Sequence, residues 1–240
     1  DQLHALAGRG HVPQVVRVAV QVDLGHGHGA RVGEDQVLER VHPVAFDLGK
    51  DLARDREHAA ALGLREAGVM LDNDGAVVVD AHNRTNVASI YAVGDVTNRV
   101  QLTPVAIREG HAFADTVFGN TPRTVDYGAI PTAVFSSPPI AGVGLTEDEA
   151  RAKHGDAIKI YRSDFRPMKN VVSGRQERGL YKMITAGADE RVVGLHLIGP
   201  DSSEVLQAAA IAVKAGLTKQ AFDDTIALHP SMAEELVLLK

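Results

Sequence analysis

From Leu62 to the end of the chain, short apolar runs alternate with turn-forming and helix-capping residues, and this pattern limits the possible folds more than any other feature. Apolar runs of strand length that are bounded by Gly, Pro, Asn or Asp are typical of β-strands. Leu71–Gly75, which is rich in Asp, Asn and Gly, is expected to form a turn. The expected strands are Ala76–Val79, Ile90–Val93, Ala133–Phe135, Ala157–Tyr161, Leu180–Thr185 and Val192–Ile198.

Helix signals stand between and after these runs. A Thr followed by Pro predicts a helix start, because Thr caps free N–H groups and Pro suits the first turn. Thr103 is thus the expected N-cap, with Pro104 at the first helical position, of a helix that reaches about Phe118. Strands and helices in this order predict an α/β segment followed by an α+β domain. The other expected helices are a short one behind the capping box Thr146–Glu149, one over Ser203–Ala215 and one after Pro230.

The first 60 residues differ from the rest in composition. Six of the eleven histidines lie there, and the stretch contains no Ser, Thr, Asn, Ile, Tyr or Met. A segment of this length normally needs Ser, Thr or Asn for helix caps and turns. The narrow alphabet is what GC-rich DNA yields in a wrong reading frame. Residues 1–61 are therefore left unassigned, with a non-native or disordered segment as the hypothesis.

Two functional patterns occur in that stretch. Val15–Val22 alternates like a strand and leads into Gly25–Ala30, which fits the G-x-G-x-x-A dinucleotide-binding fingerprint, with Asp47 near the ribose-binding distance. The helix that this fingerprint needs is poorly specified, because Gly and Pro residues interrupt it. His26 and His28 alone make a weak metal site. A turn rich in Gly and His is the simpler interpretation, and no metal site is predicted.

Composition and charge exclude several classes of function. The 240 residues are 45% hydrophobic and 23% charged, which indicates a globular protein of one or two domains. The net charge of -6 and the lack of a Lys/Arg cluster argue against a nucleic-acid partner. No apolar run reaches the roughly 18 residues of a membrane span and no signal peptide opens the chain, so a cytoplasmic location is expected. The absence of cysteine excludes disulfides, thiolate metal sites and cysteine nucleophiles.

The segment Arg84–Asp95 carries the first strong functional signal. A strand delivers Gly94, where a ligand can approach the backbone, and then Asp95, whose carboxylate suits the hydroxyls of a sugar-like chain. Taken alone, this is also a strand-ending turn. The whole string resembles the second flavin-binding motif of the pyridine-nucleotide–disulfide oxidoreductases. The resemblance implies that Gly94 and Asp95 bind FAD, with Asp95 on its ribityl chain, and that Leu102 and Thr103 meet the flavin's pyrimidine edge.

Three further strings are similar to the glutathione reductases within that family. They are Ile130–Ile140, Phe165–Met168 and Ala221–Pro230. The resemblance implies that residues 62–124 are the C-terminal part of an FAD-binding domain and residues 125–240 a dimerisation domain. His111 stands where these reductases often have Arg, and Met168 is as well explained by packing. The substrate-binding residues that the resemblance implies are Ile107, His111, Met168 and Glu235.

The last motif is His229–Glu235. By residue type alone, Ser231 and Glu234 form a capping box and Glu235 is a solvated surface residue. The family resemblance implies a catalytic pair instead. His229 protonates the departing thiolate of a disulfide substrate, a task that suits imidazole near neutral pH, and Glu234 orients the ring. The resemblance also implies a cis His229–Pro230 bond.

The implied activity is the NADPH-dependent reduction of glutathione disulfide through FAD, in a homodimer where His229 serves the partner's site. Because the chain has no cysteine, the family's redox disulfide is missing, and a truncated or mis-joined chain that is inactive alone is expected. Two alternatives stay open. One is a non-catalytic dimerisation module. The other is part of a sister enzyme, such as dihydrolipoamide dehydrogenase or mercuric reductase, although the chain lacks the C-terminal cysteine pair of the latter.

Overall fold

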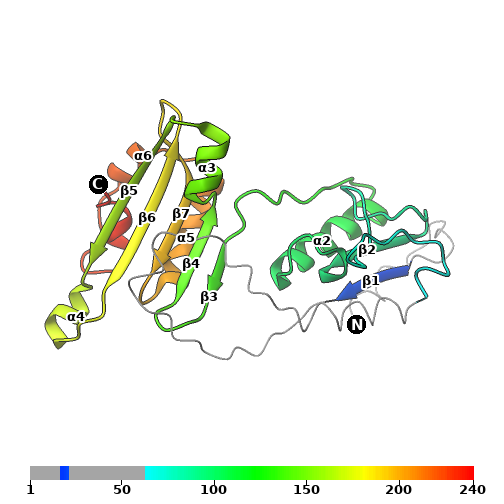
Figure 1. The fold of residues 1–240 in the computed structure, drawn as a ribbon, viewed down its shortest axis with the longest axis horizontal. Coiled ribbons are helices and arrows are strands. Elements are labelled where there is room, and N and C mark those ends of the chain that lie inside the picture. Colours follow the sequence, from blue (N-terminus) through cyan, green and yellow to red (C-terminus); the bar gives the residue numbers. More distant parts are fainter. Residues whose placement is uncertain (1–16, 22–62) are drawn as a thin grey trace. The chain divides into compact units, whose positions relative to one another are not determined.

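The structure is a computed structural model that describes residues 17–21 and 63–240 of the chain. It divides into two compact units, with the boundary between Asp126 and Tyr127 (Figure 1). Within the described residues, no helix is long and apolar enough to cross a membrane.

The first unit is built around a parallel pair of strands. β1 (Arg17–Gln21) pairs with β2 (Ile90–Gly94) in register along their whole lengths. The 3-10 turn η2 (Asp95–Thr97) follows β2, and α2 (Thr103–Val117) packs against it, with the rings of Tyr91 and Phe113 5.0 Å apart. The buried apolar side chains of this unit include Leu64, Val69, Val77, Ile90, Ala92 and Val96.

Two expectations for this unit are wrong in detail. Ala76–Val79 is not a regular strand, because the amide of Val77 bonds to Val96 whereas that of Val78 bonds to Met70. The N-cap of α2 is Leu102, so that Thr103 is already the first helical residue.

The expected strand within Val15–Val22 is present as β1. The Gly25–Ala30 loop, Asp47 and the histidines His26 and His28 lie outside the described residues.

The second unit is one antiparallel sheet with strand order β3-β4-β7-β6-β5 (Figure 1). This confirms the predicted α/β segment followed by an α+β domain. Its strands are β3 (Thr132–Val134), β4 (Ile140–Gly144), β5 (Ile158–Phe165), β6 (Gly179–Ala186) and β7 (Arg191–Ile198). Its helices are α3 (Glu147–His154), α4 (Met168–Ser173), α5 (Ser202–Lys214), α6 (Lys219–Asp223) and the 3-10 turn η3 (Ala233–Leu236).

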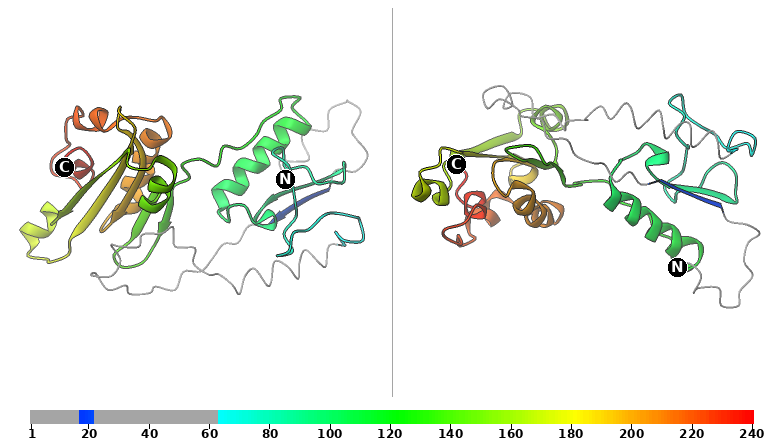
Figure 2. Two further views of the ribbon diagram at one scale, coloured as in Figure 1. Left: turned by 45° about the horizontal axis from the view of Figure 1, so that its top comes forward. Right: turned by 90° about the horizontal axis from the view of Figure 1, so that it is seen from below.

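Helices cover both faces of this sheet. Side chains alternate along β6, so Lys182 and Met183 point to opposite faces. Met183 belongs to the core beneath α5 and η3, whereas Lys182 forms an ion pair with Glu147 of α3. The ribbon shows α3 and α5 on opposite faces of the sheet (Figure 2). The fully buried side chains of the core include Tyr181, Met183, Leu195, Leu197, Leu206 and Leu239. The unit thus places its C-terminal turn firmly on the α5 face.

Local signals explain most of these elements. The capping box of α3 is present as predicted, with Thr146 and Glu149 each bonding the other's backbone N–H. The last helix is shorter than expected, because the chain forms only the 3-10 turn η3. Strand β4 was not predicted, and α4 and α6 were not either. Gly144 of β4 has a φ of 78°, and a Cβ there would lie 2.2 Å from the Val193 carbonyl oxygen, so this close approach requires glycine.

Candidate functional site

The predicted cofactor residues begin where β2 ends. Gly94 has φ 77° and ψ -154°, a conformation that favours glycine. Its N–H donates to Glu109 Oε2 over 2.6 Å, and its carbonyl accepts from the Thr97 hydroxyl over 2.8 Å. Both sides of this residue are therefore held by side chains, which fixes the direction in which Asp95 leaves the strand.

Asp95 is the first residue of η2 and is buried. A carboxylate placed behind a glycine at a strand end can accept hydrogen bonds from a polyhydroxylated chain. Asn98 then adopts the left-handed conformation and ends the turn, with its N–H bonded to the Asp95 carbonyl. This short turn keeps Asp95 at the end of β2.

The first turn of α2 supplies the second predicted contact. Leu102 is extended and no side chain caps the helix, while Pro104 has no N–H to satisfy. The N–H groups of Leu102 and Val105 donate to nearby backbone carbonyls, so the helix dipole is what makes this end partly positive. A carboxylate at Asp95 and a partly positive helix end have the chemistry that the predicted contacts with a ribityl chain and a flavin's pyrimidine edge require. Ile107 and His111, the predicted substrate residues of α2, are both exposed.

Sequence reasoning missed the charged group that holds these parts together. Glu109 of α2 is 1% exposed, and its Oε1 lies 3.1 Å from Arg99 Nη2. Arg99 also donates to the side-chain oxygen of buried Asn83. The signal in the sequence was a single Glu inside the apolar face of a helix, which gave no hint of its partners.

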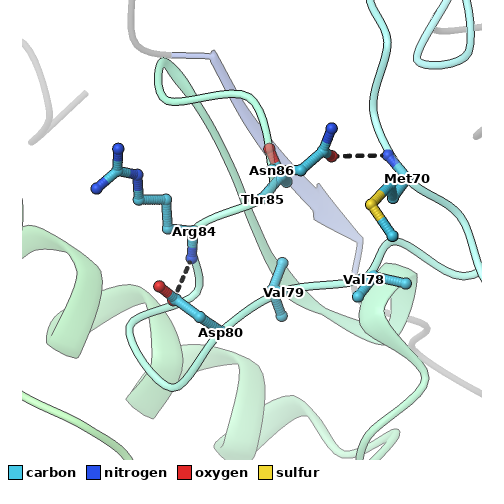
Figure 3. A pocket seen from close by; sticks show the side chains of 7 residues that line it. All are labelled: Met70, Val78, Val79, Asp80, Arg84, Thr85 and Asn86. Carbon is cyan, nitrogen blue, oxygen red and sulfur yellow. Dashed lines mark hydrogen bonds between the residues drawn. The ribbon is translucent and has the colours of Figure 1, made fainter.

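The first unit also has a surface pocket of about 470 Å³ (Figure 3). Its lining includes none of the predicted site residues. Asp80 Oδ1 accepts from the amides of His82 and Arg84, and Asn86 bonds the backbone at Met70, so these polar groups serve local turns. The pocket is therefore separate from the predicted cofactor residues Gly94 and Asp95. The pocket is lined by Met70, Val78, Val79, Asp80, Arg84, Thr85 and Asn86.

The predicted catalytic pair of the second unit is in contact. His229 Nδ1 and Glu234 Oε2 are 2.7 Å apart, and the His229–Pro230 bond is cis. The other oxygen of Glu234 accepts from the Ser231 N–H, while the Ser231 hydroxyl accepts from the Glu234 N–H. The capping box and the His–Glu pair are therefore one structure. Glu234 is buried, whereas the His229 side chain is 63% exposed, which leaves its Nε2 edge toward the surroundings.

The remaining predicted substrate residues lie in the same unit. Glu235 accepts a hydrogen bond from the Ser163 hydroxyl of β5 over 2.9 Å. Met168 begins α4 and is 45% exposed, so it is not core filling. Large apolar side chains at Ile226 and Leu228, next to His229, are strongly exposed. Two exposed apolar side chains therefore stand next to the predicted acid His229.

Two family descriptions match separate parts of this chain. Residues 130–239 match the family described as pyridine nucleotide-disulphide oxidoreductase, dimerisation domain. Residues 56–110 match pyridine nucleotide-disulphide oxidoreductase. The chain therefore belongs to the pyridine nucleotide-disulphide oxidoreductases, a family of flavoproteins that use a pyridine nucleotide.

Several individual disulfide reductases are similar to this chain in sequence. The chain is 51% identical over 179 residues to a glutathione reductase of Burkholderia cepacia, a match that covers 75% of this chain and 40% of the relative. It is 43% identical over 206 residues to a trypanothione reductase of Trypanosoma congolense, covering 82% and 42%. The chain thus spans about two fifths of the length of these relatives.

A third relative bears on the first 61 residues. A glutathione reductase of Nostoc sp. is 44% identical over 219 residues and covers 87% of this chain and 47% of the relative. A match over 179 residues covers 75% of the chain, so this longer match includes residues that precede Leu62.

The similarity extends to solved structures. The HOCl-induced flavoprotein disulfide reductase RclA from Escherichia coli has a TM-score of 0.66 and is 31% identical, and the match covers 73% of this chain and 40% of that one.

Proposed function

We propose that this chain forms part of an NADPH-dependent glutathione-disulfide reductase, with residues 62–124 on the flavin side and residues 125–240 as its dimerisation domain. The observation that carries the proposal is the 2.7 Å contact between His229 Nδ1 and buried Glu234, with the ring exposed beside an apolar surface. Glutathione reductases among the relatives support this substrate over other disulfides.

His229 would act as the proton donor. A thiolate outside this chain attacks one sulfur of glutathione disulfide, the S–S bond breaks, and the departing sulfur takes the proton from His229 Nε2. Glu234 holds Nδ1, so it orients the ring and stabilises the imidazolium before transfer. Glu235, fixed by Ser163, and exposed Met168 would contact the glutathione backbone and stem.

The first unit would bind part of FAD. Ile107 and His111 of the same unit would contact the disulfide substrate. Asp95 would accept hydrogen bonds from the ribityl hydroxyls, and Gly94 would let the ligand approach the backbone. Leu102 and Thr103 at the start of α2 would meet the pyrimidine edge, where a positive helix end favours negative charge. Flavin chemistry in this family carries an electron pair from a pyridine nucleotide, here NADPH, to a disulfide.

We further propose a homodimer, in which the exposed Ile226 and Leu228 are covered by the second copy and His229 reaches the partner's site. This agrees with the matched dimerisation domain. The alternative is a non-catalytic dimerisation module, which the absence of cysteine favours. The similarity to a trypanothione reductase keeps a different disulfide as a further alternative.

A domain graft tests the catalytic proposal. Residues 125–240 of this chain replace the dimerisation domain of the Burkholderia cepacia relative, and NADPH oxidation is measured with glutathione disulfide, trypanothione disulfide and lipoamide. The graft should reduce glutathione disulfide best. His229→Ala in the graft should lower kcat by about 10²–10⁴-fold, the usual contribution of a general acid.

The matched control is His154→Ala, which changes the last residue of α3. A folded, dimeric graft that is inactive, or one whose kcat is insensitive to His229→Ala, would support the module. Better turnover of another disulfide would indicate that the chain is part of a sister enzyme with that substrate.

A further inference from the structure

Glu109 is a buried acidic residue to which the proposed reaction gives no role. It belongs to α2, yet its carboxylate reaches the end of β2, where Oε2 accepts the Gly94 N–H over 2.6 Å. Its second oxygen faces Arg99, and Arg99 binds Asn83 in turn. A carboxylate that is only 1% exposed needs such partners, because burying it without them would be costly.

The contact acts on the one residue whose conformation sets the direction of Asp95. Gly94 lies in the left-handed region, and the Glu109 carboxylate and the Thr97 hydroxyl hold its two backbone polar groups. Rotation of the Gly94 peptide would break the bond to Glu109. The orientation of Asp95 therefore depends on a side chain that comes from the helix α2.

The same helix presents the other predicted flavin contact. The uncapped first turn of α2 begins at Thr103, and Glu109 follows on the buried side of the same helix. One rigid element thus carries both the partly positive helix end and the acceptor that fixes Gly94. Moving α2 would displace both contacts together.

We propose that Glu109, with Arg99 as its counter-ion, is a positioning residue that locks the Gly94–Asp95 step to α2 and so sets the spacing of the two flavin contacts. Its relevance to FAD rests on the proposed function. The locking itself is a property of this chain without any ligand.

The charge of Glu109 has a separate effect from its shape. Glutamine at this position keeps an oxygen that can accept the Gly94 N–H, but it loses the ion pair with Arg99. Hydrogen bonds to ionised acceptors are roughly twice as strong as neutral ones. Replacement by Gln should therefore weaken the lock, and replacement by Ala should remove it.

Amide hydrogen exchange of the whole chain, measured by NMR, tests the lock. Relative to the wild type, the protection factor of the Gly94 amide should fall about 10–100-fold in Glu109→Ala, as expected for loss of a bond to a charged group. In Glu109→Gln the loss should be smaller. The matched control is Asp115→Ala on the same helix, which removes only an exposed pair with Arg123 and should leave Gly94 unchanged.

If the Ala variant does not fold, the Gln variant still decides. The Gly94 amide proton resonance should shift upfield in Glu109→Gln, because a charge-assisted hydrogen bond becomes a neutral one. Unchanged Gly94 protection in folded Glu109→Ala, or an unchanged Gly94 resonance in Glu109→Gln, would overturn the proposal.

Addition of FAD separates this proposal from the proposed function. In the wild type, FAD at high concentration should move the amide resonances of Asp95 and Thr103, and the Ala variant should need at least about tenfold more FAD for the same change. Absence of any FAD effect in the wild type would count against the flavin role, while the exchange result alone would still judge the lock.

Discussion

The two proposed contact regions of this chain, at Gly94–Asp95 and at His229, each depend on one glutamate. Glu109 and Glu234 are both buried, and each divides its two oxygens between a backbone N–H and a basic side chain. Glu109 holds Gly94 and Arg99, and Glu234 holds Ser231 and His229. In both places a carboxylate fixes the backbone next to a residue that the proposed function needs.

The basic partners differ, and the difference separates the two roles. Arg99 is 24% exposed and also donates to Asn83, so its pair with Glu109 belongs to a network within the protein. The His229 side chain is 63% exposed, so its ring is open to a substrate. In the roles that we propose, Glu109 holds the Gly94 backbone in place, whereas Glu234 orients His229 as an acid.

The largest expected effect concerns activity. Neither region contains a thiol, because the chain has no cysteine. The purified chain with FAD, NADPH and glutathione disulfide should oxidise NADPH no faster than a mixture without protein, and it should bind FAD too weakly to retain it through purification. Measurable turnover, or a protein that purifies with stoichiometric flavin, would contradict the proposal that this chain carries only part of the active site.

The largest expected stability effect is at Glu109. Removing one partner of a buried ion pair leaves the other uncompensated and typically costs about 3–5 kcal/mol. Because Arg99 is partly exposed, we expect about 3 kcal/mol for Glu109→Ala in a urea titration followed at amide signals of β2. A decrease in the free energy of unfolding below about 1 kcal/mol would mean that Glu109 does not hold β2 and α2 together.

Glu147 shows what a carboxylate does when basic side chains take both its oxygens. Lys182 and Arg151 each approach it to 2.7 Å, and these hydrogen bonds lower its pKa to about 2 from the usual 4.5. Such a shift is worth at most about 3 kcal/mol, and solvent exposure reduces this to about 1.5 kcal/mol.

The direction of the pH effect follows from the lowered pKa. The stabilisation by Glu147 should be complete above about pH 4.5 and should disappear as the pH falls toward 2. Urea titrations of the second unit between pH 6 and pH 2.5 measure it. Glu147→Gln should remove this part of the pH dependence, and an identical pH profile in the variant would refute the assignment.

A smaller effect is expected at Glu234. Its replacement by Ala loses a capping box and an exposed partner, so the second unit should lose about 1 kcal/mol in a urea titration. Ser231→Ala is the matched variant, because it removes the hydroxyl half of the box and leaves the contact with His229. A loss at Glu234 as large as that at Glu109 would erase the difference between the two regions.

The same comparison explains what the sequence could predict. His229 and Glu234 are five residues apart, and Ser231 lies between them, so local chain geometry brings them together. Glu109 and Gly94 are 15 residues apart and meet only because α2 packs on β2. Arg99 and Asn83 join this cluster through irregular turns whose course no local pattern specifies.

The fold shows the same limit. Apolar runs of strand length predicted β6 and β7, and the Thr–Glu pair predicted the start of α3. Strand β4 was missed because its glycines, which the close contact with β7 requires, weaken the strand signal. The cap of α2 was misassigned because Leu102, a poor capping residue, occupies the position that tertiary packing selects.

The most direct test of the central claim, that Glu234 orients His229 as an acid, is the tautomer of the His229 ring. It is obtained from the imidazole ¹⁵N chemical shifts of the whole chain at a pH where the ring is neutral. We predict the tautomer that carries its proton on Nδ1, hydrogen-bonded to Glu234, and none on Nε2. Glu234→Ala should lose the preference for this tautomer. A proton on Nε2 in the wild type, or the same tautomer in both proteins, would contradict it.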